Sequence, residues 1–180
     1  MSTLKKILIG IGIIIAIPFV VALFLPKSYL VERSVSIAKP ASETYNYVKF
    51  LKNQDNYSVW AMKDLEMKKS YSGEDGKVGF VSRWESKNEE LGVGEQEIKM
   101  LDDTKMRIET ELRFFEPFES TEQSYMTVTA IDNKSSKVLW GFNGNLAYPM
   151  NLMCLFMDFE QLIGKDFEEG LANLKLVLEK

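Results

Sequence analysis

Four carboxylates lie at spacings that suit proton transfer. Glu95 and Glu97 belong to one alternating segment, and Glu109 and Glu111 belong to the next. Two carboxylates that share a pocket can acquire different pKa values and act as an acid and a base. Strand alternation, however, places all four on the face opposite the apolar residues of the same segments. A charge ladder exposed to solvent is therefore the favoured interpretation, and we predict no catalytic residue.

The register of that ladder is a specific prediction. A three-residue loop at 103–105 would join the two segments as an antiparallel hairpin. The pairs expected from this loop are Lys99 with Glu109, Glu95 with Arg113, and Glu97 with Glu111. Oppositely charged pairs of this kind contribute little when solvated.

The residue types exclude much other chemistry. The chain has no histidine and a single cysteine, Cys154. Intrachain disulfides, Cys/His zinc sites and Ser-His-Asp or Cys-His catalysis are therefore excluded. Cys154 is expected to be a small buried apolar residue. The loop aspartates lack the alternating spacing of a calcium loop, so we predict no metal and no cofactor.

An uncharged apolar run extends from Ile7 to Leu25. A helix of this length reaches ~28 Å, close to the thickness of a bilayer's hydrocarbon core. Lys5 and Lys6 precede the run, so the N-terminus is expected in the cytoplasm and the rest of the chain outside it, for instance in a periplasm. A cleaved signal peptide is the alternative, but its apolar region usually has only about 7–15 residues.

The remaining chain is acidic. Without Lys5 and Lys6, residues 27–180 hold 20 basic and 26 acidic residues, a net charge of −6. Nucleic acid is therefore not an expected partner. We assign residues 1–28 to a membrane anchor with a short linker and residues 29–180 to one domain. The oligomeric state is left open.

The domain has an α+β pattern. Residues 29–37 alternate as a strand; Pro40 ends it, and Ser42 is the expected N-cap of a short helix, followed by a second helical turn near 53–60. A period of two then marks six further strands at 65–72, 78–86, 94–101, 106–115, 120–131 and 137–143. The turns are too short for parallel crossovers, so an antiparallel meander is expected.

The C-terminal segment changes to a helical period. Apolar residues recur at steps of three and four from Leu155 to Leu178 and predict one long amphipathic helix. Gly164 and Gly170 interrupt it and are interpreted as a kink and a close approach to the sheet. One curved sheet around one helix follows from this order of elements.

Four sequence features occur together: Val31–Ile37 leading to Pro40, Trp60, Gly79–Glu85 followed by Gly92-Val93-Gly94, and Ile163–Lys175. Together they resemble the SRPBCC superfamily of START and Bet v-like helix-grip proteins. The resemblance covers nearly all of 29–178 and is nearest to the polyketide cyclase/dehydrase-like branch. It implies a seven-stranded antiparallel sheet gripping the C-terminal helix, with an apolar cavity between them. Relatives of this kind bind lipids or other hydrophobic molecules, and some catalyse cyclisation or dehydration.

If that cavity is present, its wall is expected to consist of the inward-facing residues of the strands, identified by alternation, and of residues from the long helix. Met100 is expected to point inward with this set, and simple core packing is the alternative for every member. The predicted ligand-binding residues are Trp60, Phe80, Trp84, Ile98, Met106, Ile108, Leu112, Phe114, Phe156 and Phe159.

Three functions fit the sequence. The leading hypothesis is a membrane-anchored protein that binds a hydrophobic small molecule or lipid without transforming it. The second is an enzyme of cyclase or dehydrase type, which requires a titratable group that points into the cavity. The third is a protein-interaction module whose cavity is filled by side chains.

Overall fold

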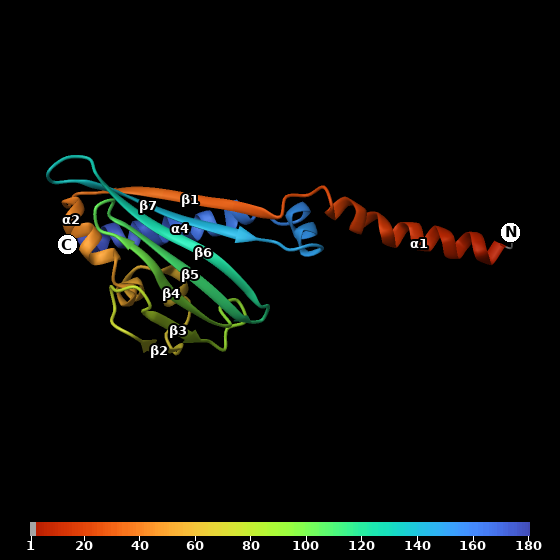
Figure 1. Ribbon diagram of the computed structural model, residues 1–180, viewed down its shortest axis with the longest axis horizontal. Helices are drawn as coiled ribbons and strands as arrows, with labels where there is room; N and C mark the ends of the chain where they lie inside the picture. Colours follow the sequence, from red (N-terminus) through yellow and green to blue (C-terminus); the bar gives the residue numbers. More distant parts are fainter. Residues whose placement is uncertain (1–2) are drawn as a thin grey trace.

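The computed structural model describes residues 3–180. An open antiparallel sheet curves around a long helix, and a separate apolar helix extends from one end (Figure 1). The helices and strands, in chain order, are α1 (Thr3–Ala22), β1 (Ser28–Ile37), α2 (Ala41–Val48), the 3-10 helix η1 (Leu51–Asn56), α3 (Val59–Lys63), β2 (Lys68–Ser72), β3 (Val81–Glu85), β4 (Val93–Asp102), β5 (Arg107–Glu116), β6 (Ser120–Ala130), β7 (Ser136–Asn145), the 3-10 helix η2 (Met150–Leu155) and α4 (Phe159–Leu178).

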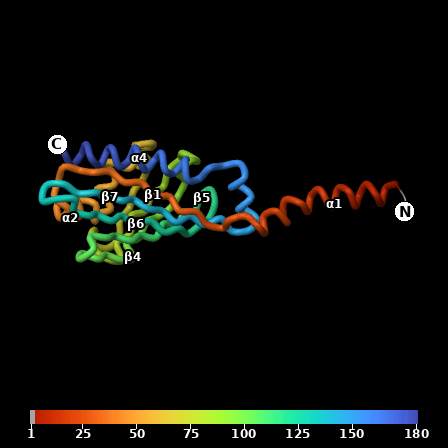
Figure 2. The backbone as a smooth tube through the Cα atoms, turned by 90° about the horizontal axis from the view of Figure 1, so that it is seen from above, coloured from red at the N-terminus to blue at the C-terminus, as the bar shows by residue number. Residues whose placement is uncertain are grey.

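The sheet has the predicted antiparallel topology. Its seven strands lie in the order β1-β7-β6-β5-β4-β3-β2, so every strand from β2 to β7 pairs with its neighbour in sequence. Short turns allow only such hairpins, and β1 completes the sheet by pairing with β7. Seen from above, α4 runs alongside β1 (Figure 2). The predicted helix-grip architecture is confirmed.

Several predicted helix ends are wrong for local reasons. The residue that precedes α2 is Pro40, and no side chain caps this helix, so Ser42 is not the N-cap. The long helix begins at Phe159 instead of 155, because the Asp158 carboxylate accepts a hydrogen bond from the backbone N–H of Gln161 at 3.0 Å and caps the helix there. The residues just before it form the separate helix η2.

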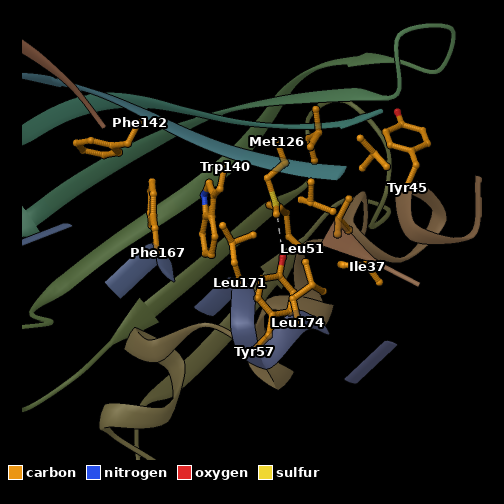
Figure 3. Close-up of a cluster of buried hydrophobic side chains, with 14 of the residues drawn as sticks. Ile37, Tyr45, Leu51, Tyr57, Met126, Trp140, Phe142, Phe167, Leu171 and Leu174 are labelled. Carbon is orange, nitrogen blue, oxygen red and sulfur yellow. Dashed lines mark hydrogen bonds between the residues drawn. The ribbon is translucent and has the colours of Figure 1, made fainter. Parts of the chain in front are cut away.

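The core lies between the sheet and α4 (Figure 3). Trp140 of β7 stacks on Phe167 of α4 with ring centroids 4.5 Å apart, and Leu171 and Leu174 are fully buried beside them. Full burial of one such leucine contributes about 1.5–3 kcal/mol. Gly170 permits this close packing, because a Cβ there would lie 3.1 Å from the Trp140 ring. The predicted close approach of the helix to the sheet is thus confirmed.

The predicted charge ladder is correct over most of its length. Glu95 pairs with Arg113 and Glu97 with Glu111, as expected. The Arg113 guanidinium donates to Glu95 at 2.6 Å, to Glu97 at 2.7 Å, and to Glu111. The hydrogen bond that Arg113 donates to Glu97 is the main cause of the lowered pKa of Glu97, and a hydrogen bond from Lys99 lowers this pKa further by a smaller amount. The carboxylates are therefore partnered on the outer face of the sheet.

The prediction that Lys99 faces Glu109 is wrong because the turn after β4 has four residues, 103–106, instead of the predicted three, and because β4 contains an irregularity. The register shifts between Ile98 and Met100, so Met100 takes the place opposite Glu109 and Lys99 has no strand partner. An extra residue in one strand reverses the side-chain phase beyond it. Met100 consequently does not point inward as expected; it is 37% exposed, and Leu101 packs against the core in its place.

Helix α1 stands apart from the sheet (Figure 1). It has 20 residues, an 18-residue window of it has a mean hydropathy of 2.3, and its side chains are exposed along almost the whole length. By length and composition it is able to cross a membrane. A few residues link its end at Ala22 to the start of β1 at Ser28.

Candidate functional site

A cavity of about 260 Å³ lies between the curved sheet and the helices α3 and α4. Strands β2 to β7 form one side, and η1, α3 and the first half of α4 form the other. The volume is just below the ~300–1,000 Å³ of typical ligand pockets. The interior is therefore hollow, with room for a small molecule or for part of a longer one.

All three tryptophans of the protein line this cavity. Trp60 of α3 meets Trp140 edge to face with ring centroids 6.1 Å apart, and Trp84 of β3 meets Phe114 of β5 in the same way at 5.8 Å. The indole N–H of Trp84 donates to the carbonyl of Leu91 at 3.1 Å. Because that polar atom is satisfied within the protein, the ring presents an apolar surface.

Further apolar side chains complete the wall. They come from helices as well as strands, which gives the cavity apolar surfaces on opposite sides. These residues are Leu51, Ala61, Met67, Leu91, Leu112, Phe142, Ile163 and Phe167. A wall of this composition favours an apolar or aromatic occupant.

A smaller polar set lies in the same wall. The Lys69 ammonium and the Asp55 carboxylate form an ion pair at 2.5 Å, and the Tyr71 hydroxyl donates to Asp55 at 3.2 Å. Gln96 donates to the Thr110 hydroxyl at 2.9 Å. The other polar residues of the wall are Gln54, Ser58, Ser82, Glu90 and Ser124. Such groups are suited to orienting one polar end of a ligand.

The predicted ligand-binding residues divide into two groups. Those that line the cavity are Trp60, Trp84, Leu112 and Phe114. Those that belong to the adjoining core are Phe80, Ile98, Ile108 and, partly buried, Met106. Strand alternation selects the inner face correctly, but it does not distinguish the hollow part of that face from the filled part.

The expected contribution of the long helix is wrong at both predicted positions. Phe156 precedes α4, and 85% of its side-chain surface is exposed. Phe159 occupies the first position of α4 and stacks on Tyr29 of β1 with ring centroids 5.2 Å apart, away from the cavity. Both predictions assumed a helix that starts near residue 155.

Four of the cavity residues that sequence reasoning missed come from β7 and α4. Trp140 and Phe142 share the inward phase of Val138 in β7, and Ile163 and Phe167 lie on the apolar stripe of α4. Both signals are present in the sequence. Strand order was the absent information, because β7 lies inside the sheet between β1 and β6 and therefore faces the helix directly.

Glu122 of β6 is a second omission. It is 5% exposed and shares the inward phase of Ser124 and Met126. Burial raises the pKa of its carboxyl, although hydrogen bonds from the backbone and side chain of Asn145, at 2.8 and 3.3 Å, oppose that shift. The carboxyl is held by Asn145 and does not line the cavity. An acid positioned in this way supports the sheet end and has no direct access to a bound molecule.

No protein-family model and no curated protein matches the chain. Solved structures do match it. Truncated norcoclaurine synthase from Thalictrum flavum has a TM-score of 0.61 at 13% identity, over 85% of this chain and 95% of that one. A protein from Nitrosospira multiformis has a TM-score of 0.57 at 13% identity, over 83% and 96%. The protein Ara h 8.0201 has a TM-score of 0.54 at 10% identity, over 84% and 97%. At these identities the likeness establishes the fold alone.

Proposed function

We propose that this chain, which has the helix-grip fold of the SRPBCC superfamily, binds a hydrophobic small molecule or lipid in the cavity between sheet and helix. The observation that carries the proposal is an open volume of about 260 Å³ surrounded by three tryptophans. The indole N–H groups of Trp84 and Trp140 donate to Leu91 and Ser124, so these two rings offer apolar surface to apolar and aromatic groups. Filling such a cavity with apolar atoms contributes ~0.8 kcal/mol for each buried methylene group.

One structural neighbour supports small aromatic molecules as a ligand class for this fold. Thalictrum flavum norcoclaurine synthase has been solved in complex with dopamine and hydroxybenzaldehyde. That likeness carries no residue roles to this chain at 13% identity. The chemistry of the present wall, in which the Lys69–Asp55 ion pair lies beside Trp84, the strand partner of Lys69, suits an amphipathic molecule whose apolar part lies among the tryptophans.

The proposed role is binding without chemistry. Three side chains with ionisable acid or ammonium groups line the cavity: Asp55 and Lys69 form an ion pair at 2.5 Å, and the exposed carboxylate of Glu90 lies 3.8 Å from the Lys63 ammonium. Glu122, a buried acid with a raised pKa, is held by Asn145 outside the cavity wall. General acid-base catalysis needs a group within hydrogen-bond reach of the reacting atom. The arrangement favours a polar anchor for a ligand over a proton-transfer pair.

The proposal includes anchoring by α1. A single span from Ile7 to Leu25, with Lys5 and Lys6 on the cytoplasmic side, would place the domain at the outer surface of the membrane. Apolar molecules partition into bilayers, so a binding domain held at the surface would meet its ligand there. The short linker to β1 supports this closeness.

Photo-crosslinking tests the binding site. The full-length chain in lipid nanodiscs would be irradiated with a fatty acid that carries a diazirine, and the modified peptides would be mapped by mass spectrometry. We expect crosslinks on peptides that contain Trp84 and Ile163, which face the same cavity from opposite sides. Crosslinks confined to residues 3–25 would contradict a ligand in the cavity, because they report only fatty acid dissolved in the bilayer.

A further inference from the structure

A second apolar surface lies outside the cavity, at the end of the domain from which α1 emerges. The sequence from Leu146 to Met157 contains no charged residue. This segment includes η2, which appears as the blue coil beside the start of the domain in Figure 1. Its exposed apolar side chains, which we name the apolar tip, are Tyr148, Met150, Leu155, Phe156 and Met157, with exposed fractions from 39 to 85%.

The apolar tip is joined directly to the end of α1. The Asn151 side-chain amide of η2 donates to the carbonyl of Ala22 at 2.7 Å and to that of Leu25 at 3.3 Å. The last carbonyls of a helix have no partner within the helix, so the buried Asn151 satisfies that of Ala22 and also binds the linker carbonyl of Leu25. The backbone N–H of Leu146 also donates to the carbonyl of Lys27 at 2.8 Å. The tip therefore has a fixed position relative to the last turn of α1.

Helix length places that last turn at the edge of the bilayer. The part of α1 from Ile7 to Ala22 covers ~24 Å, and the apolar residues 23–25 that follow it bring the path close to the ~30 Å of a hydrocarbon core. If Ile7 lies at one boundary, Leu25 lies at the other, and Lys27 is the first charged residue beyond it. Because Asn151 contacts Ala22 and Leu25, η2 lies at the same depth as this boundary.

We propose that the apolar tip inserts into the outer interface of the bilayer as a second membrane contact. This inference rests on the anchoring by α1 in the proposed function. Uncharged segments rich in leucine, methionine and aromatic residues bury their apolar side in this zone. This second contact fixes the orientation of the domain relative to the bilayer, which a single span with a flexible linker would leave variable.

A bilayer suits this surface better than a protein partner. The tip adjoins the end of α1, whose apolar run is also exposed. The bilayer that covers this run therefore also reaches the tip. Charged residues resume at Asp158, directly after the tip, and at Lys27, two residues after the apolar run that ends at Leu25. The same boundary therefore separates apolar from charged sequence on both segments.

Depth-dependent quenching tests the insertion. A Cys154→Ser background leaves the chain free of cysteine. Single variants Gly12→Cys, Phe156→Cys and Ile131→Cys would be labelled with a small fluorophore and reconstituted at full length into phosphatidylglycerol and phosphatidylethanolamine vesicles. Lipids with a doxyl group on the acyl chain would serve as quenchers. Ile131 is the matched control, because it is an exposed apolar residue in the β6–β7 turn at the opposite end of the domain.

We expect the labels at positions 12 and 156 to lose most of their fluorescence and the label at 131 to keep it. Quenching at 12 without quenching at 156 would overturn the tip contact while leaving α1 as an anchor. A label at 156 that changes its emission but is not quenched indicates a covering protein surface, such as a second copy of the chain, and also overturns the inference. Absence of quenching at 12 would refute the anchor itself. Cavity binding is measured separately by crosslinking, so each proposal can fail alone.

Discussion

Filling the cavity from within should remove ligand binding without unfolding the protein. Ala61 of α3 lines the cavity, and Ala61→Phe adds about six ring carbons to its wall. At ~0.8 kcal/mol for each excluded methylene of the ligand, the upper limit of the loss is about 5 kcal/mol. Partial rearrangement of the ligand lowers this figure, so we expect at least about 2 kcal/mol, or roughly thirtyfold in Kd.

The assay is a displacement titration with a dansyl-labelled fatty acid and the full-length chain in nanodiscs. Ala130→Phe is the matched control, because Ala130 is exposed at the end of β6 and away from the cavity. This control should bind as the wild type does. The ring of Ala61→Phe enters open space, so its midpoint of urea unfolding should differ little from that of the wild type. An affinity for the probe equal to that of the wild type would refute the reasoning that the cavity is the binding site.

Three further changes test the fold and its attachment to α1. Arg113→Leu should lower the free energy of unfolding by about 1–3 kcal/mol at pH 7, because hydrogen bonds to charged groups are lost. Since folding lowers the pKa of Glu97, the stabilisation from its ionised carboxylate is present above the unfolded pKa and is lost as pH falls through the folded pKa. Urea unfolding should therefore show a smaller stability difference between wild type and variant in acid than at pH 7. Gly94→Ala should cost about 1–3 kcal/mol and alter the emission of Trp84, because the new Cβ would overlap that ring; unchanged stability and emission would contradict this packing. Asn151→Ala should accelerate trypsin cleavage in the linker after α1, because two carbonyls lose their donor; equal cleavage rates would show that Asn151 does not hold the linker.

The antiparallel connections from β2 to β7 could be predicted because their signals are local, whereas the pairing of β1 with β7 could not. Alternation and short turns fix an antiparallel meander, and the apolar stripe fixes a long final helix. The register of β4 and β5 agrees with the prediction from Glu95 to Ile98, because the extra residue of the bulge offsets a turn of four residues, 103–106, in place of the predicted three. Between Ile98 and the turn the predicted register fails, because nothing in the local pattern identifies Lys99 as the extra residue of a bulge. One inserted residue reverses the phase of Met100 and Leu101.

The candidate site was predictable in part. Inward phase correctly selects Trp84, Leu112 and Phe114, because alternation is a local property. Where the inner face stays hollow depends on how far the sheet curves from α4, which no single segment encodes. At Phe156 a local signal gave a wrong prediction. The helical periodicity of the sequence continues through Phe156, but the Asp158 cap starts the helix later and leaves the Phe156 ring exposed.

The tryptophans provide the most direct measurement of ligand binding in the cavity. All three line it, so a brominated fatty acid bound there lies close to every tryptophan in the protein. The account predicts saturable quenching of tryptophan fluorescence, with one fatty acid for each chain, and loss of that quenching in Ala61→Phe. Quenching that rises linearly with added fatty acid, and is equal in the wild type and the variant, would contradict a binding site in the cavity.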